Sequence, residues 1–275
     1  IGLSLFHSVA SFNNSGFDVL GNGTSLIPYQ KDVFLNLVTC ALVIAGGIGF
    51  PVIFELPQKH FSWKRLSMHT RVVLSTTFAL LLFGTLLLKL TENISWLGAF
   101  FYSVSARTAG FSTYNLGDFS TAGLLVVSGL MFIGASPAST GGGIKTTTFF
   151  VLLSGIYSAA TNHSERAFHS AIPKDAFRKA SVISMLAVFL VMTASYLMLI
   201  FDPQLSLRDV LFEMISAFST SGLSTGITSQ LSAQSRILSI IMMYIGRLGP
   251  LTVASLWYFT IGERVRYPEG TIAIG

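Results

Sequence analysis

The sequence has 275 residues, of which 11% are charged and 51% are hydrophobic, and its formal net charge is +5. A soluble domain carries about 25% charged residues, so this composition excludes an ordinary soluble protein and indicates that much of the chain faces lipid. The basic residues are scattered over loops without an aromatic–basic stripe, which argues against nucleic acid as a partner. The single cysteine, Cys40, excludes an intrachain disulfide.

Charge-free runs predict the membrane spans, because an unpaired charge at the centre of a bilayer costs about 3 kcal/mol or more. In chain order the runs are Val33–Phe54, Val72–Leu88, Phe119–Ile144, Ala180–Phe201 and Ile237–Gly262, the last with one charge, Arg247. Beyond Lys145 the third run continues without charge to Ser164, which is too long for one helix. Counting this stretch as one broken span gives five crossings.

The basic residues then sort between the two sides of the membrane. The segments 55–71, 161–179 and the tail after Gly262 are rich in lysine and arginine, whereas 89–118 and 202–236 mix both signs. The positive-inside rule therefore predicts a multi-pass plasma-membrane protein whose basic loops and C-terminus are cytoplasmic. The chain opens on IGLSLFHSVA, without a charged leader or a starting Met, so we expect it to begin inside a longer protein.

Three segments on the outer side align without gaps: SLFHSVASFNNSGFDVLG from Ser4, GAFFYSVSARTAGFSTYNLG from Gly98 and DVLFEMISAFSTSGLSTGIT from Asp209. In each, about ten apolar residues lead into small polar residues and one glycine. The glycines are Gly16, Gly110 and Gly222, spaced by 94 and 112 residues. Such a period accommodates one helix, a short re-entrant element and a second helix.

An apolar run of ten residues covers about half of a ~30 Å hydrocarbon core, so each segment must enter the membrane and turn back. Non-helical backbone at that depth is tolerated only where it is buried in protein or lines a wet cavity, which predicts a shared aqueous axis. Glycine permits conformations that direct successive carbonyls one way, as in the filters of potassium channels. The expected ion-binding residues are Asn13, Asn14, Ser15, Gly16, Thr108, Ala109, Gly110, Thr220, Ser221 and Gly222.

These residues resemble a known family, the Trk/Ktr/HKT potassium transporters, and within it the KtrB-like membrane subunits. FNNSGFD at 12–18, ARTAGFS at 106–112 and FSTSGLSTGIT at 218–228 look like its second, third and fourth pore loops. ASTGGGIKTTTF at 138–149 and YIGRLGPLT at 244–252 look like the second helices of its third and fourth repeats. The resemblance covers essentially the whole chain.

The resemblance implies an all-α integral membrane fold, with helix–pore loop–helix repeats around a pseudo-fourfold pore. Only three of four pore loops are present, so we expect the first repeat to be missing from this chain. The remaining units would be residues 1–60 (second repeat, pore loop and inner helix only), 61–164 (third repeat, with a broken gating helix) and 165–275 (fourth repeat).

The overlong apolar run contains helix-breaking residues: Gly134, Pro137, Gly141, Gly142 and Gly143. Proline removes a helix hydrogen bond and each glycine costs about 1 kcal/mol relative to alanine, so we expect the helix to break here; a kinked helix is the alternative. By resemblance the stretch is an intramembrane gate beneath the filter. A phosphate-binding loop is excluded, because Ile144 separates Gly143 from Lys145 and the required motif is not met.

Arg247 lies mid-span, where ionisable residues usually face a water-filled path. The resemblance agrees, and we predict a gate formed by the residues Gly141, Gly142, Gly143, Lys145 and Arg247. The alternative is a structural contact of Arg247 with a pore-helix acid or with helix carbonyls. Glu213, in the fourth pore helix, either orients the filter or pairs with a nearby cation.

The predicted function is that of a potassium-translocating subunit of a Ktr/Trk-type uptake system, with no enzyme activity and no covalent cofactor. The resemblance further implies K⁺ as the transported ion, Na⁺ as an activator, a homodimer in the lipid bilayer, and a cytosolic ring of nucleotide-binding, KtrA-like regulatory subunits. Alternatives are a sodium-conducting or sodium-coupled relative and, from other classes, an intramembrane enzyme or a structural subunit. Glycine at all three visible filter positions favours potassium.

Overall fold

The computed structural model describes residues 1–249 and 252, apart from residues 19, 22, 163–165, 169 and 174. Its helices are α1 (Gly2–Phe12), α2 (Val33–Gly47), α3 (Phe50–Gln58), α4 (Met68–Thr91), α5 (Trp96–Ser105), α6 (Thr121–Phe132), α7 (Thr146–Thr161), α8 (Ala176–Phe201), α9 (Leu207–Ser219) and α10 (Ala233–Leu248). A small antiparallel hairpin, β1 (Arg166–Ala167) with β2 (Ser170–Ala171), lies between α7 and α8. Short 3-10 turns occupy Ile27–Tyr29, Trp63–Arg65, Leu116–Asp118 and Ile227–Gln230.

Helix lengths divide the molecule into long spans and short elements. With 24 and 26 residues, α4 and α8 are each long and apolar enough to cross a membrane alone. A third candidate span is α2 together with α3, which meet at an angle of 97°. The helices α1, α5 and α9 have 11, 10 and 13 residues, which at 1.5 Å per residue reach about half-way through a ~30 Å core. The short elements were predicted to enter and turn back.

The surface of α8 explains how a long apolar helix is accommodated. Met185, Phe189 and Tyr196 are 74%, 65% and 65% exposed and follow one another at helical spacing along one face. The opposite face, which includes Ala187 and Met198, is buried in a core cluster. An exposed apolar stripe of this length fits lipid as its solvent, and the buried face holds α9 and α10.

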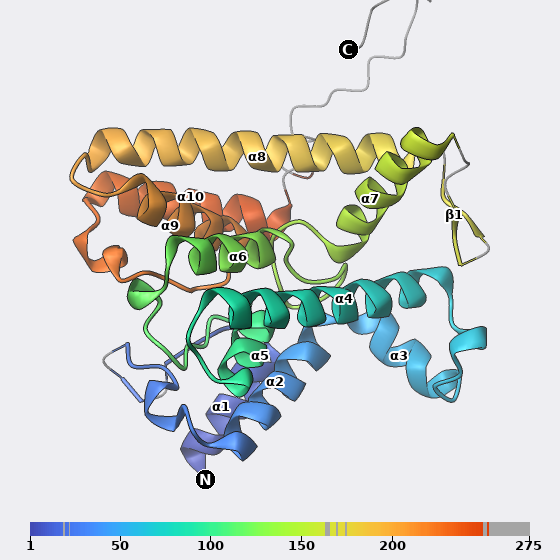
Figure 1. The fold of residues 1–275 in the computed structure, drawn as a ribbon, viewed down its shortest axis with the longest axis horizontal. Coiled ribbons are helices and arrows are strands. Elements are labelled where there is room, and N and C mark those ends of the chain that lie inside the picture. Colours follow the sequence, from blue (N-terminus) through green and yellow to red (C-terminus); the bar gives the residue numbers. More distant parts are fainter. Residues whose placement is uncertain are drawn as a thin grey trace, which may run out of the picture.

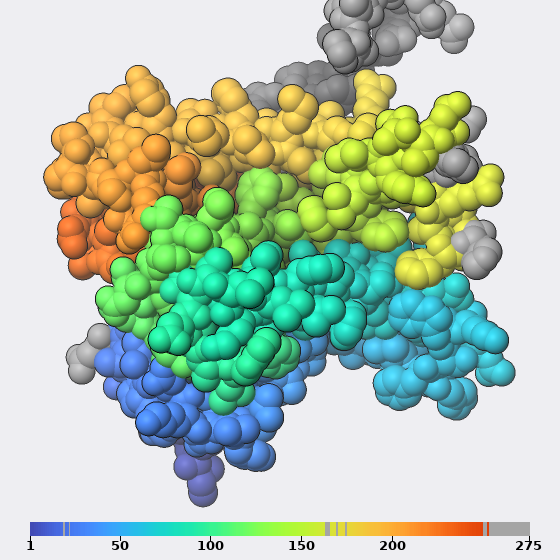
Figure 2. All heavy atoms as spheres, viewed as in Figure 1, coloured from blue at the N-terminus to red at the C-terminus, as the bar shows by residue number. Residues whose placement is uncertain are grey.

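Helices pack in a repeating order from one side of the molecule to the other (Figure 1). Each short helix packs against the helix that follows it, as α1 does on α2 and α9 on α10. The helix after a loop then packs on the next short helix, as α2 does on α5 and α6 on α9. Figure 2 shows the result: the segment up to α3 lies on one side, α4 to α6 in the middle, and α8 to α10 on the other, while α7 runs from the middle to one end of α8.

The two turns inside the membrane region follow from local sequence. Gly49, after α2, has φ 91°, a conformation that favours glycine, and Pro51 starts α3, so the expected single span at 33–54 bends there. Gly249, after α10, also has φ 91°. The rest of the last expected span, to Gly262, lies outside the described residues except for Thr252.

Serine side chains fix where the long helices begin. Ser67, Ser120 and Ser232 are the N-caps of α4, α6 and α10, and each accepts a hydrogen bond from a backbone N–H in the first turn. Each cap also gives its own N–H and hydroxyl to a carboxylate from the preceding part of the fold. For Ser120 the acceptor is Glu92 Oε1, at 3.0 and 2.6 Å, and for Ser232 it is Asp202 Oδ2, at 3.1 and 3.0 Å. These contacts join the ends of successive long helices.

Candidate ion pathway

The three predicted loops have the same backbone conformation. Gly16, Gly110 and Gly222 follow the short helices α1, α5 and α9, with φ of 62°, 81° and 80°. Two residues before each glycine, Asn14, Thr108 and Thr220 have φ of 50°, 85° and 54°. Positive φ is uncommon outside glycine, above all for β-branched threonine, so each loop stores backbone strain at an equivalent place. Such strain is typical of functional sites.

The structure brings the three glycines together. A Cβ built on Gly16 would lie 2.5 Å from the carbonyl oxygen of Ala109 and 3.0 Å from Cα of Gly110. A Cβ on Gly110 would overlap the carbonyl oxygen of Ser221 and lie 3.4 Å from Cα of Gly16, and one on Gly222 would lie 3.9 Å from Cα of Gly110. Main chain from segments 94 and 112 residues apart therefore converges on one place. At Gly16 and Gly110 any side chain would collide with backbone, whereas at Gly222 it is the φ of 80° that favours glycine.

The residue beside each glycine is tied back to its own short helix. Ser15 Oγ donates to Ala10 O at 3.1 Å, and Ser221 Oγ contacts Ser216 Oγ at 3.1 Å and Met131 Sδ at 2.9 Å. Ala109 and Thr108 are fully buried. These side chains stabilise the loops from behind.

Asn13 and Asn14 differ in their surroundings. The exposed Asn13 donates its side-chain amide to Val9 O at 2.9 Å. Asn14 is 5% exposed. With its side-chain amide nitrogen turned toward α1 and α2, that nitrogen lies 3.1 Å from Ser11 O and 3.2 Å from Val43 O. That orientation presents its amide oxygen to Thr108 Oγ1 at 3.5 Å, so Asn14 links two of the three loops.

The predicted break after α6 is present, and it is a loop rather than a kink. Residues 133–145 leave the helix completely between Phe132 and Thr146. We call this segment the intramembrane loop. Its two ends are held together by Ile144 N to Phe132 O at 3.1 Å and by Thr146 N to Ala135 O at 3.3 Å.

The intramembrane loop packs directly against the strained residues of two of the three glycine loops. A Cβ on Gly141 would overlap Thr108 Oγ1, and one on Gly142 would lie 2.6 Å from Thr220 Oγ1 and 2.8 Å from Ser219 O. Glycine is needed here for close approach rather than for a turn.

The intramembrane loop also occupies the broken end of α2. Ser136 N donates to Gly47 O at 3.1 Å, and Thr140 donates its N–H and its hydroxyl to Gly46 O at 3.4 and 3.2 Å. In return, Phe50 N at the start of α3 donates to Ala138 O at 3.0 Å. The bend between α2 and α3 thus frees backbone groups that the loop satisfies.

Two positively charged side chains donate hydrogen bonds to adjacent backbone carbonyls of the intramembrane loop. Lys145 Nζ donates to Gly141 O at 2.7 Å, and Arg247 Nη1 donates to Thr140 O. Among the described residues Arg247 forms no ion pair, and its side chain borders a cavity of about 440 Å³ together with Thr220 and Gly222. Arg247 of α10 therefore contacts the loop at Thr140, one residue before the carbonyl that Lys145 binds.

One residue of the site escaped the sequence reasoning. Arg107, directly before Thr108, is only 3% exposed, and its Nε and Nη1 have no hydrogen-bond partner among the described residues. The sequence analysis counted it with the charges of the outer side. The sequence does carry a signal for a special role: Arg107 lies between a short membrane helix and a loop glycine, where burying a charge costs free energy.

Comparison with known proteins matches this chain to a family model described as TrkH, cation transport protein, over residues 2–87 and 66–260. The chain belongs to the TrkH family. This is a family of transport proteins rather than enzymes, as the sequence predicted.

Relatives of this chain include the Ktr system potassium uptake protein B of Vibrio alginolyticus, 36% identical over 99% of this chain and 62% of the relative. Protein D of the Ktr system in Bacillus subtilis is also 36% identical, over 98% and 63%. The potassium/sodium uptake protein NtpJ of Enterococcus hirae is 34% identical, over 100% and 64%. The chain thus spans less than two thirds of the length of these relatives.

Among solved structures, the potassium transporter TrkH from Vibrio parahaemolyticus matches with a TM-score of 0.74 at 17% identity, covering 92% of this chain and 57% of that one. This likeness confirms the predicted all-α membrane transporter fold.

Proposed function

We propose that this chain forms most of the potassium-conducting path of a Ktr/Trk-type uptake system. The observation that carries the proposal is the convergence of Gly16, Gly110 and Gly222, whose backbones touch although they are far apart in sequence. Backbone carbonyls in such an arrangement replace the hydration shell of a potassium ion. The names of the Vibrio and Bacillus relatives as potassium uptake proteins support K⁺ as the ion.

A fourth loop, supplied by polypeptide outside residues 1–275, would complete the ring. In the described chain Cβ atoms on Gly16 and Gly110 face the carbonyls of Ala109 and Ser221, whereas a Cβ on Gly222 meets no carbonyl within 4 Å. The unfilled direction is therefore beside Gly222.

The surface of α10 supports the same location for a fourth short helix. A Cβ on Gly46 of α2 would overlap Phe12 O, four residues before Gly16, and a Cβ on Gly246 of α10 would overlap Phe218 O, four residues before Gly222. Each residue of α2 therefore corresponds to the residue of α10 whose number is 200 higher. On α2, the residues Thr39, Cys40 and Val43 face Phe101 and Val104 of α5. On α10, the corresponding Ser239, Ile240 and Met243 line a cavity of about 260 Å³.

The intramembrane loop would act as the gate beneath the filter. Its contacts with Thr108 and Thr220 put it against the filter loops, and its carbonyls are held by Lys145 and Arg247. Opening would require these two charged hydrogen bonds to be broken, each worth about 1.5–3 kcal/mol. The side chains of Lys145 and Arg247 thus hold the loop in a closed state, and breaking their hydrogen bonds needs only a modest free energy.

Sodium transport is the second candidate, and the potassium/sodium uptake protein of Enterococcus hirae favours it. Glycine at positions 16, 110 and 222 favours potassium as the transported ion. The family resemblance supports Na⁺ as an activator. We also propose a plasma-membrane homodimer with cytoplasmic basic loops, which would offer a docking surface to a ring of nucleotide-binding regulatory subunits.

The decisive experiment is rubidium uptake and growth rescue in cells that lack potassium uptake, using the protein with its native flanking sequence. Gly110→Ser should lower the preference for potassium over sodium, because a side chain there collides with Ser221 O. Gly21→Ser is the matched control: Gly21 has φ 84°, close to the 81° of Gly110, and its Cβ would meet nothing within 4 Å. Equal ion preference in wild type and Gly110→Ser would refute the filter assignment.

A further inference from the structure

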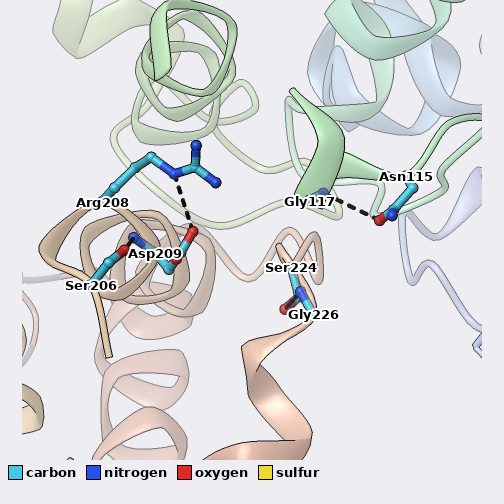
Figure 3. Close-up of polar contacts among 7 residues, drawn as sticks. All are labelled: Asn115, Gly117, Ser206, Arg208, Asp209, Ser224 and Gly226. Carbon is cyan, nitrogen blue, oxygen red and sulfur yellow. Dashed lines mark hydrogen bonds and ion pairs between the residues drawn. The ribbon is translucent and has the colours of Figure 1, made fainter. Parts of the chain in front are cut away.

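A closed ring of polar contacts lies behind the loop that contains Gly222. Glu213, on α9 nine residues before that glycine, is 8% exposed. Its Oε2 is 2.8 Å from Ser224 Oγ, its Oε1 is 2.5 Å from Thr228 Oγ1, and the two hydroxyl oxygens are 2.8 Å apart. Ser224 Oγ also accepts the N–H of Gly226 at 3.0 Å, and Figure 3 shows the two residues facing each other. The ring therefore fixes the backbone that leaves the filter.

Counting the protons in the ring shows whether the carboxyl group of Glu213 is ionised or protonated. Three oxygen–oxygen contacts at hydrogen-bond distance need three protons, and the hydroxyls of Ser224 and Thr228 supply one each. An ionised Glu213 would leave one pair of oxygens in contact without a proton between them. With a protonated Glu213 the ring closes: the acid donates to Thr228, Thr228 donates to Ser224, and Ser224 donates to the second carboxyl oxygen.

The charges around Glu213 agree with a neutral group. Among the described residues no lysine or arginine forms an ion pair with it. Arg236 lines the same cavity, but its Nη2 donates to Ser229 O at 3.2 Å. A buried and unpaired carboxylate is costly, whereas a protonated acid with satisfied hydrogen bonds is not.

The equivalent brace behind Gly110 is made of neutral groups. Tyr102 of α5 donates its hydroxyl to Tyr114 O at 2.6 Å and accepts Tyr114 N–H at 3.2 Å. Ser105 Oγ donates to Phe111 O at 2.6 Å. In both loops a side chain of the short helix is hydrogen-bonded to the segment just after the glycine. The two loops share this arrangement, but the groups are hydroxyls in α5 and a carboxyl in α9.

We propose that Glu213 is a positioning residue that carries a proton and, through Ser224 and Thr228, holds the backbone after Gly222 in the conformation that selects the ion. This inference rests on the proposed function of the Gly222 loop. It requires the hydrogen-bonded ring and not a negative charge, so a neutral side chain of the same shape will replace Glu213.

The variants separate shape from charge. Glu213→Gln keeps the ring, because its amide donates to Thr228 and its oxygen accepts from Ser224. Glu213→Asp is one methylene too short, and Thr228→Val removes a member of the ring. Glu92→Gln is the matched control. Glu92 also accepts a hydrogen bond from a serine hydroxyl, that of Ser120, and among the described residues it has no hydrogen bond to Gly16, Gly110, Gly222 or the residues next to them.

The preference for rubidium over sodium is measured by uptake in the protein with its native flanking sequence. We expect Glu213→Gln and Glu92→Gln to keep the wild-type preference. Glu213→Asp and Thr228→Val lower it about 10-fold, the effect of losing one hydrogen bond worth about 1.4 kcal/mol. Loss of preference in Glu213→Gln, or its retention in both ring-breaking variants, overturns the inference.

A second measurement does not depend on transport. The infrared difference spectrum between purified wild type and Glu213→Gln at neutral pH should contain the carbonyl stretch of a protonated carboxyl, which the Glu92→Gln difference lacks. Absence of that band overturns the inference. Wild-type protein that shows the band but no selective rubidium uptake would instead reject the proposed function, so the two failures are distinguishable.

Discussion

Replacing Gly46 by alanine tests a close contact between a short helix and the helix that follows its loop. An added Cβ would overlap Phe12 O. Alanine gains about 1 kcal/mol over glycine in a helix interior. Overpacking costs about 1–3 kcal/mol, and the upper end applies because the obstacle is backbone, which cannot rotate away. We therefore expect a net loss of about 2 kcal/mol of stability in Gly46→Ala.

The change also reaches the proposed gate, because Gly46 O accepts both hydrogen bonds from Thr140. In detergent, thermal unfolding of Gly46→Ala should move down by about 5 °C, from a relation of about 2–4 °C per kcal/mol, and rubidium uptake should change with it. Gly129→Ala in α6 is the control: its Cβ meets nothing within 4 Å, so only the helix-propensity gain remains. Equal unfolding temperatures for the two variants would refute the packing argument.

Other predictions concern charged groups. Arg247→Gln should raise ion flux without loss of membrane insertion, because one charged hydrogen bond to the intramembrane loop is lost. Arg236→Gln, near the start of α10, should leave flux unchanged. Equal flux in all three proteins removes Arg247 from the proposed gate. Hydrogen bonds from Ser235 and Ser232 hold the pKa of Asp202 below its ordinary 3.8. Its stabilisation is therefore complete at neutral pH and lost on acidification below that value, and Asp202→Ala should unfold at lower temperature at pH 7 but match wild type in strong acid.

The sequence predicted the elements whose signals are local. The charge-free runs located α4 and α8, and the glycines and proline at 134–143 located the break after α6. The three aligned segments ending in Gly16, Gly110 and Gly222 predicted a common centre, and in the structure the backbone at Gly110 lies beside that at Gly16 and at Ser221. Repetition was decisive, since a single half-span ending in glycine has many structural explanations.

The contacts between distant segments could not be predicted in the same way. Nothing in the run 33–54 indicates that Gly46 and Gly47 offer their carbonyls to residues 136–140, because the bend at Gly49 is needed to free them. The exposed side chain of Arg247 likewise depends on which helices surround α10. Such features arise from tertiary packing, which periodicity does not encode.

The position of α3 has a mechanical consequence. At its first residue, Phe50 N–H binds Ala138 O of the intramembrane loop. Five residues later, Glu55 accepts the N–H and hydroxyl of Ser67 at 2.6 Å each, and it also binds Thr70 at the start of α4. This short helix therefore connects the intramembrane loop at one end with the basic turn at 59–67 at the other. Under the proposed function, a regulatory subunit bound to that turn would act on the proposed gate through α3, without contact with the transported ion.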